Sequence, residues 1–429
     1  MAAETVEYKL FGLKLWQQVL IALALGVAVG MVIQALVSQQ VLSVEASKQV
    51  ANNIKIFGTV FINLIKMVVV PLIFLALVSG ITSMDDPTNF TRIGFKGIIT
   101  YLSTASFAVL IGISAGLIFE PGKGVAVDLS SFAKDVPEAS KASPSIGDFL
   151  LGLIPTNAFR AMTEDNFLQV VLFSLFFGFT INMLGDRVSK LKELLREASY
   201  VVFKMIEYIV RLAPMAVFGF MAWSIGTQGP KILETLAMLV VAVLAACVLQ
   251  YILFGLMIMF FGRISPMPFY RKMMPTQLMA FSTSSSKATL TTAMRELQTK
   301  MGVSEQSSNF LMPLGACINM DGTAIYLGIC ALFFSQLFGI ELHAHDYVVL
   351  VLTCTLGSIG AAGIPSGSII FMGMVLSSVG LPLDGIGLLL GVDRLLDMVR
   401  TTINITGDAA ITLMIDSSED KIDKEIYFS

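Results

Sequence analysis

Residues 383–415 read LDGIGLLLGVDRLLDMVRTTINITGDAAITLMI, an apolar stretch that nevertheless contains Asp393, Asp397, Arg400 and Asp408. With Asn404, these residues fall at offsets 0, 4, 7, 11 and 15. At about 100° per residue, the offsets place them within one helical stripe less than about 90° wide. An ionisable side chain costs roughly 2.5–3.5 kcal/mol at the centre of a bilayer, so the stripe must face protein, ions or a polar ligand. The stretch therefore predicts a buried binding site on a membrane helix, as expected of a transporter.

The composition indicates an integral membrane protein. Hydrophobic residues make up 55% of the 429 residues and charged residues 14%, whereas a soluble domain usually carries about 25% charged residues. We expect a single membrane domain over residues 1–429, because polar linkers long enough to separate domains are missing. Residues 16–37 are expected to form a first span and not a signal peptide, since acidic residues precede them and a small-residue cleavage site is lacking.

Charge, cysteine and histidine content argue against several classes of protein. Net charge is −3 without a basic cluster, so nucleic acid is not an expected partner. Two histidines, His343 and His345, are too few for a transition-metal site. The cysteines lie in apolar segments without CxxC spacing, so we expect buried thiols and no disulfides: Cys247, Cys317, Cys330 and Cys354.

A bilayer core about 30 Å thick needs roughly 20 apolar residues as helix. The segments that meet this requirement predict eight spans: 15–37, 56–83, 97–119, 166–184, 199–225, 232–261, 306–338 and 384–415. Lysine and arginine gather at 9–14, 92–96, 187–196 and 263–272, and placing these groups in the cytoplasm puts both termini inside. The sequence thus predicts a multi-pass protein of the cell's inner (plasma) membrane.

Two further segments are predicted to be re-entrant helical hairpins. Residues 347–383 hold no Asp, Glu, Lys, Arg or His, and as one helix they would run about 55 Å, too long for a single crossing. Their middle, GSIGAAGIPSGS at 357–368, breaks any helix. In 273–294, the run STSSSK at 282–287 interrupts a moderately apolar segment. Non-helical backbone survives at membrane depth only when buried in protein or lining a polar cavity, so both tips predict a polar site near the midplane.

The stretch GACINMDGT at 315–323 predicts a cation site in the seventh span. Gly322 suggests unwound backbone with free carbonyls. A hard cation such as Na⁺ prefers carboxylate, amide and main-chain oxygens, and Asn319, Asp321, Asn404 and Asp408 supply that set. The alternative is that these residues only form buried polar contacts that lock two helices together.

Arg400 is a permanently charged, planar fork suited to a carboxylate, and a nearby acid such as Asp397 could take an amine. The alternative is a structural ion pair of Arg400 with Asp397 or Asp393.

Residues 284–287, SSSK, formally match the S-x-x-K signature of Ser/Lys acyl enzymes, but no partner motif occurs and we do not predict an enzyme. Hydroxyls and backbone N–H groups at this tip are better suited to cradle a carboxylate.

Four ordered motifs resemble the dicarboxylate/amino acid:cation symporter family, which contains the glutamate transporters and their prokaryotic aspartate- and glutamate-transporting homologues. They are SSSKATL at 284–290, NMDGT at 319–323, GAAGIPSGS at 360–368 and DMVRTTINITGD at 397–408. The likeness covers essentially the whole chain, including KMVVVPLIF at 66–74.

The resemblance implies an all-α membrane fold of eight transmembrane helices and two re-entrant hairpins, with inverted repeats and elevator motion, assembled as a homotrimer. It implies that residues 10–84 and 120–262 hold much of the scaffold, or trimerisation, domain. Residues 85–119 and 263–416 would form the transport domain. Within it, hairpin one is 266–298, span seven 306–338, hairpin two 346–380 and span eight 384–415.

The resemblance also implies roles for individual residues. Arg400 would bind the side-chain carboxylate of the substrate and Asp397 its amino group. The other substrate contacts would come from Ser284, Ser286, Thr323, Gly363, Ile364, Thr401 and Asn404. One sodium site would use Gly315, Asn319, Asn404 and Asp408; a second Tyr101, Thr104, Asn319 and Asp321; a third main-chain oxygens of Cys317, Ser358, Ile359 and Ala361.

Some positions depart from the family pattern. Archaeal members carry Arg where Ser284 stands, and animal members carry Arg where Met398 stands. Lys287 occupies a usual Ser position and is a candidate for the missing positive charge. Thr291 replaces the usual Pro, and Ala105 replaces a Ser or Thr of the second sodium site.

Asp397, Arg400 and Asp408 are all present in this chain. Within the family, this combination implies sodium-coupled symport of L-aspartate or L-glutamate, with no cofactor other than the coupling ions. The alternatives are a proton- or sodium-coupled C4-dicarboxylate carrier and, more distantly, an ion channel. The choice between aspartate and glutamate rests on one methylene, worth about 1–3 kcal/mol in a pocket, and is not predicted. Ion stoichiometry, stereoselectivity and anion conductance are not predicted either.

Overall fold

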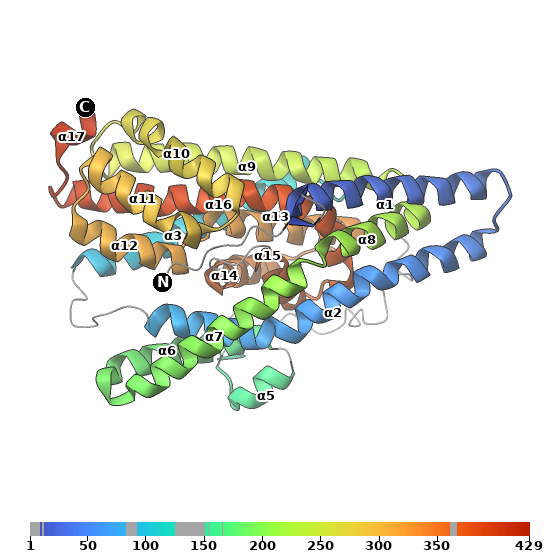
Figure 1. The fold of residues 1–429 in the computed structure, drawn as a ribbon, viewed down its shortest axis with the longest axis horizontal. Helices are drawn as coiled ribbons and strands as arrows, with labels where there is room; N and C mark the ends of the chain where they lie inside the picture. The colour runs from blue at the N-terminus through green and yellow to red at the C-terminus, as the bar shows by residue number, and fades with distance from the viewer. Residues whose placement is uncertain are drawn as a thin grey trace.

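The computed structural model describes residues 9–10, 13–82, 92–124, 151–152, 154–164, 166–360 and 367–429. Over these residues the protein is built from helices, apart from a pair of two-residue antiparallel strands, β1 (Lys9–Leu10) and β2 (Leu13–Lys14). The helices lie roughly along one long axis (Figure 1). The predicted all-α membrane fold is confirmed at this level.

One group of helices comes from the first half of the chain. It contains α1 (Leu15–Ser38), α2 (Val44–Thr82), α5 (Ala158–Thr163), α6 (Phe167–Leu184), the 3₁₀ turn η3 (Gly185–Val188), α7 (Ser189–Val210) and α8 (Ala213–Gln228). The α1 helix packs on α8, while α2 packs on α6, α7 and α8. Large apolar side chains such as Phe176 and Met183 are exposed on these helices, as expected of surfaces that face lipid.

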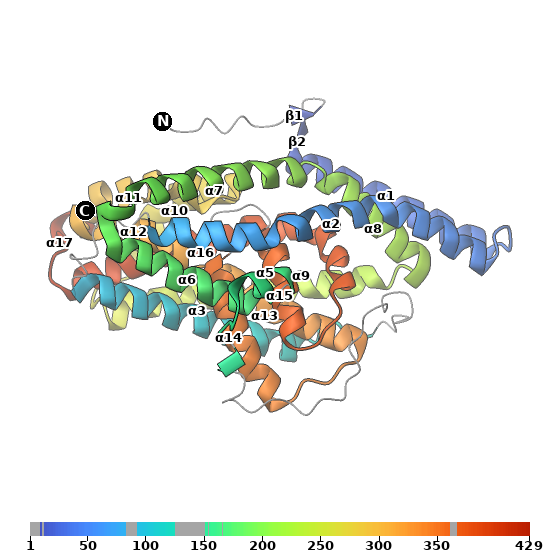
Figure 2. The same ribbon diagram turned by 90° about the horizontal axis from the view of Figure 1, so that it is seen from below.

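The second group surrounds the stripe-bearing helix. It contains α3 (Arg92–Phe119), α9 (Ile232–Phe260), α10 (Met267–Thr283), α11 (Ser286–Met301), α12 (Glu305–Ile318), α13 (Asp321–Phe338), α14 (Ala344–Gly360), α15 (Gly367–Ser378), η4 (Leu383–Gly385), α16 (Ile386–Ser418) and α17 (Lys424–Phe428). The α16 helix runs through the middle of this group in both views (Figures 1 and 2) and packs against α9, α10, α12 and α13. The α9 helix lies in the stretch that we assigned to the scaffold, yet it packs mainly against α3, α13 and α16. The division into scaffold and transport domains remains a prediction.

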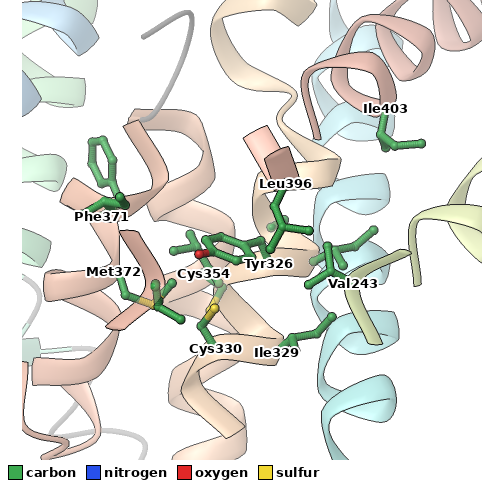
Figure 3. Close-up of a cluster of buried hydrophobic side chains, with 14 of the residues drawn as sticks. Val243, Tyr326, Ile329, Cys330, Cys354, Phe371, Met372, Leu396 and Ile403 are labelled. Atoms are coloured by element: carbon green, nitrogen blue, oxygen red, sulfur yellow. The ribbon is translucent and has the colours of Figure 1, made fainter. Parts of the chain in front are cut away.

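The core of the second group is an apolar cluster drawn from several helices. Figure 3 shows Tyr326 and Cys330 of α13 between Val243 of α9, Cys354 of α14 and Leu396 of α16. All five side chains are almost completely buried. Because α13 is buried along nearly its whole length, any polar group that it carries lies inside protein.

Phe220 of α8 lies where the two groups of helices meet. A Cβ built at Gly58 of α2 would be 2.4 Å from the Phe220 ring, and one built at Gly387 of α16 would also be 2.4 Å from it. The ring is therefore packed between two stretches of bare backbone, one from each group.

The helix boundaries test the predicted spans. Within the described part of the chain, six stretches are long and apolar enough to cross a membrane, including residues 15–38, 92–119 and 232–260. The single predicted span at 199–225 is wrong, because α7 ends at Val210 and α8 begins at Ala213. Pro214 lies in the first turn of α8, and a proline lacks the N–H that would continue the preceding helix.

The two predicted hairpins correspond to pairs of helices. The α10 and α11 helices pack together and are joined at Ser284, whose φ of 51° is left-handed. The α14 and α15 helices also pack together, with 361–366 between them outside the described residues. Re-entry into the membrane remains a prediction for both pairs.

The predicted break in the seventh span occurs, but not at Gly322. The α12 helix ends at Ile318 and α13 begins at Asp321, so the chain leaves the helix at Asn319 and Met320. Gly322 is already in the first turn of α13, where a Cβ would be 2.6 Å from the carbonyl oxygen of Arg400. Its glycine is needed for close approach of two helices rather than for unwinding.

Candidate functional site

The predicted stripe on α16 is buried in full. Asp393, Asp397, Arg400, Asn404 and Asp408 are between 0% and 7% exposed. Each faces protein rather than lipid, because α16 is surrounded by α9, α10, α12 and α13. The predicted burial of the stripe is confirmed, but α16 is buried on nearly all sides, so burial alone does not distinguish this face from the others.

Arg400 is the centre of the first half of the stripe. Its Nη2 donates to Asp393 Oδ1 at 2.9 Å, to Asp397 Oδ1 at 3.1 Å and to the hydroxyl of Ser368 at 2.7 Å. The guanidinium carbon lies 4.0 Å from the centre of the Tyr326 ring, a cation–π contact. Thus three acceptors and one aromatic face hold the guanidinium in place.

Two of the three guanidinium nitrogens of Arg400 make no hydrogen bond to the described residues. Its Nε and Nη1 are buried without a hydrogen-bond partner among them. A guanidinium carries five N–H donors, three of them on these two nitrogens. A buried donor without an acceptor costs free energy, so these N–H groups are suited to bind an incoming carboxylate.

The structural ion pair that we considered for Arg400 does exist, with Asp393 and Asp397 as its partners. It does not use the whole guanidinium, because the hydrogen bonds of Arg400 to the described residues are all made through Nη2. Arg394, on the preceding turn, approaches Asp397 Oδ2 at 3.5 Å and is a second cation beside that carboxylate. The sequence interpretation had not assigned a role to Arg394.

An oxygen-rich cluster occupies the second half of the stripe. Asn319 Nδ2 donates to Asp408 Oδ1 at 3.1 Å, and Thr104 donates to Asn319 Oδ1 at 3.2 Å. Asn404 Oδ1 accepts from the backbone N–H of Gly322 at 2.8 Å. Thr104, Asn319 and Asp408 thus form one hydrogen-bonded chain between α3, the break before α13, and α16, and Asn404 is bonded separately to the start of α13.

Asp321 extends this cluster toward α9. Its Oδ2 accepts from Gln250 Nε2 at 3.0 Å, whereas its Oδ1 has no hydrogen bond among the described residues. Asp408 Oδ2 is likewise buried without a described donor. No salt bridge within the described part of the chain joins a basic residue to either acid. Buried carboxylates of this kind are compensated by cations or protons.

Two other predicted ligands lie beside this cluster. A Cβ at Gly315 would be 2.7 Å from Asp408 Oδ1 and 2.9 Å from the Tyr101 hydroxyl, so the α12 backbone passes directly against the acid. The hydroxyl of Tyr101 itself donates to the carbonyl of Leu311 at 2.9 Å. In the described residues no three of His, Cys, Asp and Glu gather into a metal-binding group, and the donors here are mixed amide, hydroxyl and carboxylate oxygens.

The remaining predicted substrate residues are only partly brought together. Thr323 and Thr401 are buried near the stripe, and Asn404 Nδ2 lies 3.5 Å from the Thr323 hydroxyl. Ser284 and Ser286 are buried at the α10–α11 junction, without a hydrogen bond to the α16 stripe among the described residues. Gly363 and Ile364 lie outside the described residues. Lys287, the candidate extra cation, places its Nζ 4.8 Å from the Phe203 ring of α7.

The third predicted sodium site is not assembled by the described contacts. Cys317 is partly buried at the end of α12, and the Ser358 hydroxyl donates to the carbonyl of Thr355 at 2.8 Å. Ile359 is the penultimate residue of α14, while Ala361 lies outside the described residues. These assignments remain predictions.

Sequence reasoning missed Ser368, Tyr326 and Gln250. Gln250 could have been found, because it is the single amide side chain in the long apolar run 232–260. Ser368 and Tyr326 carried no comparable signal, since a serine or a tyrosine within an apolar helix is common.

A buried arginine beside acids, next to an oxygen cluster inside an all-α membrane protein, defines a membrane transporter for ionic solutes. The profile of the sodium:dicarboxylate symporter family matches residues 15–418. The chain belongs to this family.

Several bacterial relatives are similar along most of the chain. A "proton/glutamate-aspartate symporter" of Escherichia coli is 33% identical over 384 residues, covering 88% of this chain and 87% of that protein. "C4-dicarboxylate transport protein 1" of Mesorhizobium japonicum is 32% identical and covers 96% of this chain and 84% of its own length. A "C4-dicarboxylate transport protein" of Rhodopseudomonas palustris is 33% identical over 96% of this chain and 90% of its own length. This chain's family is one of symporters, and the relatives named here carry either acidic amino acids or C4-dicarboxylates.

Proposed function

We propose that this protein is a sodium-coupled symporter of acidic amino acids, L-aspartate or L-glutamate, in the bacterial inner membrane. The observation that carries the proposal is the pairing of Arg400 with Asp397 in a fully buried site. Arg400 has unused N–H donors on Nε and Nη1 for a carboxylate, and Asp397 offers a negative charge to an amine. A zwitterion with a second carboxylate satisfies both groups at once.

Substrate binding in this proposal exchanges partners without leaving a charge unpaired. The substrate side-chain carboxylate accepts from an unused N–H group of Arg400, on Nε or on Nη1, while Asp393 and Ser368 keep Nη2 in place. The substrate amine then lies against Asp397, which Arg394 also approaches. Thr323, Thr401 and Asn404 add hydrogen bonds from α13 and α16, and the α10–α11 junction closes over the carboxylate.

Sodium is the proposed coupling ion because Asp321 and Asp408 have no basic partner among the described residues. Asn319 donates to Asp408 and accepts from the Thr104 hydroxyl, while Asp321 accepts from the Gln250 amide. A monovalent hard cation satisfies such a set better than a transition metal. Movement of α3 and α10–α16 as a transport domain within a homotrimer, with both termini cytoplasmic, completes the proposal.

Uptake into proteoliposomes tests the coupling. Purified protein with labelled L-aspartate should accumulate it when sodium is high outside, and should not do so when choline replaces sodium at the same pH. A third set of vesicles receives a proton gradient without sodium. Equal accumulation without sodium would contradict sodium coupling.

A C4-dicarboxylate carrier is the second candidate, favoured by the names of two of the relatives. Such a carrier has no amine to bind, so Asp397 would serve only to hold Arg400. Competition separates the two candidates. Unlabelled L-aspartate should displace the labelled substrate at concentrations where succinate does not, and the reverse order would favour the second candidate.

A further inference from the structure

Gln250 is a buried amide that the proposed ligand sets leave out. It lies in the second half of α9 and is 0% exposed, although α9 is otherwise apolar after Glu234 apart from Thr235. A primary amide buried without full hydrogen bonding is costly, and an apolar residue of the same size would fill the space. Its presence therefore calls for a polar partner on a neighbouring helix.

That partner is Asp321, the first residue of α13. Gln250 Nε2 donates to Asp321 Oδ2 at 3.0 Å, and α9 packs against α3, α13 and α16 around this point. An ionised carboxylate only accepts hydrogen bonds, so the amide must present its NH₂ group to Asp321 and its oxygen elsewhere. The orientation of the amide is thus fixed by its partner.

Two oxygens remain without donors. Gln250 Oε1 and Asp321 Oδ1 are both buried and lack a hydrogen bond among the described residues. Each is bonded to the same carbon as an atom of the Gln250–Asp321 hydrogen bond, so the two belong to one small region. Thr104 interacts with the Asp321 carboxylate, and its hydroxyl also donates to Asn319. Gln250 Oε1 and Asp321 Oδ1 thus remain without a described hydrogen bond beside the Thr104 hydroxyl, and buried oxygens of this kind are suited to a cation.

We propose that Gln250 is a cation-binding residue, which holds Asp321 through its NH₂ group and offers its amide oxygen to the coupling cation. This inference rests on the proposed sodium coupling and adds a ligand from α9, a helix that contributes none of the assigned residues. An amide oxygen is a hard, uncharged donor of the kind that alkali cations accept. Gln250 thereby makes α9 part of the cation site.

The experiment measures sodium binding directly, in purified protein without substrate, by radiolabelled sodium or by calorimetry. Gln250→Leu keeps the volume but removes both functions of the amide, and it should raise the half-saturating sodium concentration by about tenfold or more. Gln250→Asn keeps an amide on a shorter side chain and should have a smaller effect. Melting curves of both variants identify the folded samples in which binding is compared.

Gln336→Leu is the matched control. Gln336 is a glutamine of α13 whose two ends are already bonded, Nε2 to the carbonyl of Gly116 at 2.8 Å and Oε1 to the N–H of Gly122 at 3.0 Å. Its loss should lower stability without changing sodium affinity. A Gln250→Leu variant that lowers stability in the same way, with sodium affinity within twofold of the parent protein, would overturn the proposal.

A double-mutant cycle tests whether the two groups act on one cation. Once Asp321→Asn has removed the charge, Gln250→Leu should cost little further sodium affinity. Fully additive effects would contradict a shared site. Parent protein that binds no sodium at all would instead refute the proposed sodium coupling.

Discussion

Along α16, the segment Asp393–Arg400 and the segment Asn404–Asp408 bury ionic groups among different partners. In the first, an arginine lies within 3.1 Å of two carboxylates and against an aromatic ring. In the second, Asp408 and neighbouring Asp321 contact amides, without a basic partner among the described residues. The first segment carries its own counter-charge, and the second must obtain it from outside. This difference is the reason for our proposal that the solute binds at the first segment and the coupling cation at the second.

The largest expected loss of substrate affinity comes from removing Arg400, the cation that neutralises the acids of the first segment. Arg400→Cys leaves Asp393 and Asp397 without their cation, and breaking a buried pair costs roughly 3–5 kcal/mol. Affinity for L-aspartate should fall at least about 100-fold, and neutral amino acids should become better substrates than acidic ones. Binding and uptake competition in proteoliposomes measures both changes.

Arg394→Cys is the control for that variant. Arg394 lies on the same helix and reaches Asp397 only at 3.5 Å. It should retain the preference for acidic substrates. If Arg400→Cys also retained this preference, Arg400 would not be the carboxylate-binding group.

Asp408→Asn should have the next largest effect, on the segment without a counter-charge. It keeps the shape but removes a charge, and hydrogen bonds or contacts to charged groups are worth about 1.5–3 kcal/mol. The half-saturating sodium concentration should rise about 10- to 100-fold, measured as sodium-dependent uptake and as sodium binding.

Asp416→Asn provides the comparison on the same helix. Asp416 is also buried, but it accepts from the backbone N–H and the hydroxyl of Ser304 at 3.0 and 2.6 Å. Its change should alter stability and leave sodium dependence as it was. Unchanged sodium dependence in Asp408→Asn would refute the ion assignment.

Asp397→Asn should affect substrate binding at the first segment without affecting sodium binding at the second. It removes the proposed partner of the substrate amine, so affinity for L-aspartate should fall about tenfold or more. Sodium binding without substrate should stay within about twofold, because Asp397 belongs to the arginine segment. Succinate, which has no amine, should lose less affinity than aspartate; an equal loss for both would favour the dicarboxylate carrier.

The smallest expected effect lies just beyond the end of α16, where Glu419 pairs with Lys96 and with Arg92. The hydrogen bond from Lys96, with the nearby Arg92, holds the pKa of Glu419 below its usual range. This pairing therefore stabilises the fold above the ordinary glutamate pKa, and the stabilisation is lost as pH falls through the lowered value. Glu419→Gln should cost about 1 kcal/mol or less near neutral pH and nothing in acid. Melting temperatures at both pH values measure this, and an equal loss in acid would contradict the ionic account.

The sequence predicted the face of α16 but not the partners on it. Helical periodicity places Asp393, Asp397 and Arg400 on one side, and three-residue and seven-residue spacing brings them together locally. The contacts of Ser368 and Gln250 come from distant segments, and no local spacing encodes which helix packs against which. Such partners follow only from tertiary structure.

The helix breaks were predicted unevenly for a similar reason. The run 306–338 was predicted to unwind because Gly322 interrupts it, whereas the break lies just before, at Asn319 and Met320. The run 199–225 was taken as one span because its hydropathy is continuous, and Pro214 was overlooked as a helix start. Hydropathy reports burial in lipid, whereas breaks depend on backbone hydrogen bonding.

The packing of Phe220 has a mechanical consequence. Its ring touches bare backbone at Gly58 on one side and at Gly387 on the other. If α16 moves past α8 with the proposed transport domain, these two contacts let it slide without a change of side-chain rotamer at either glycine. A Gly→Ala substitution at either position would place a methyl group against the Phe220 ring. On this proposal it would slow turnover while leaving the ligand pocket itself intact.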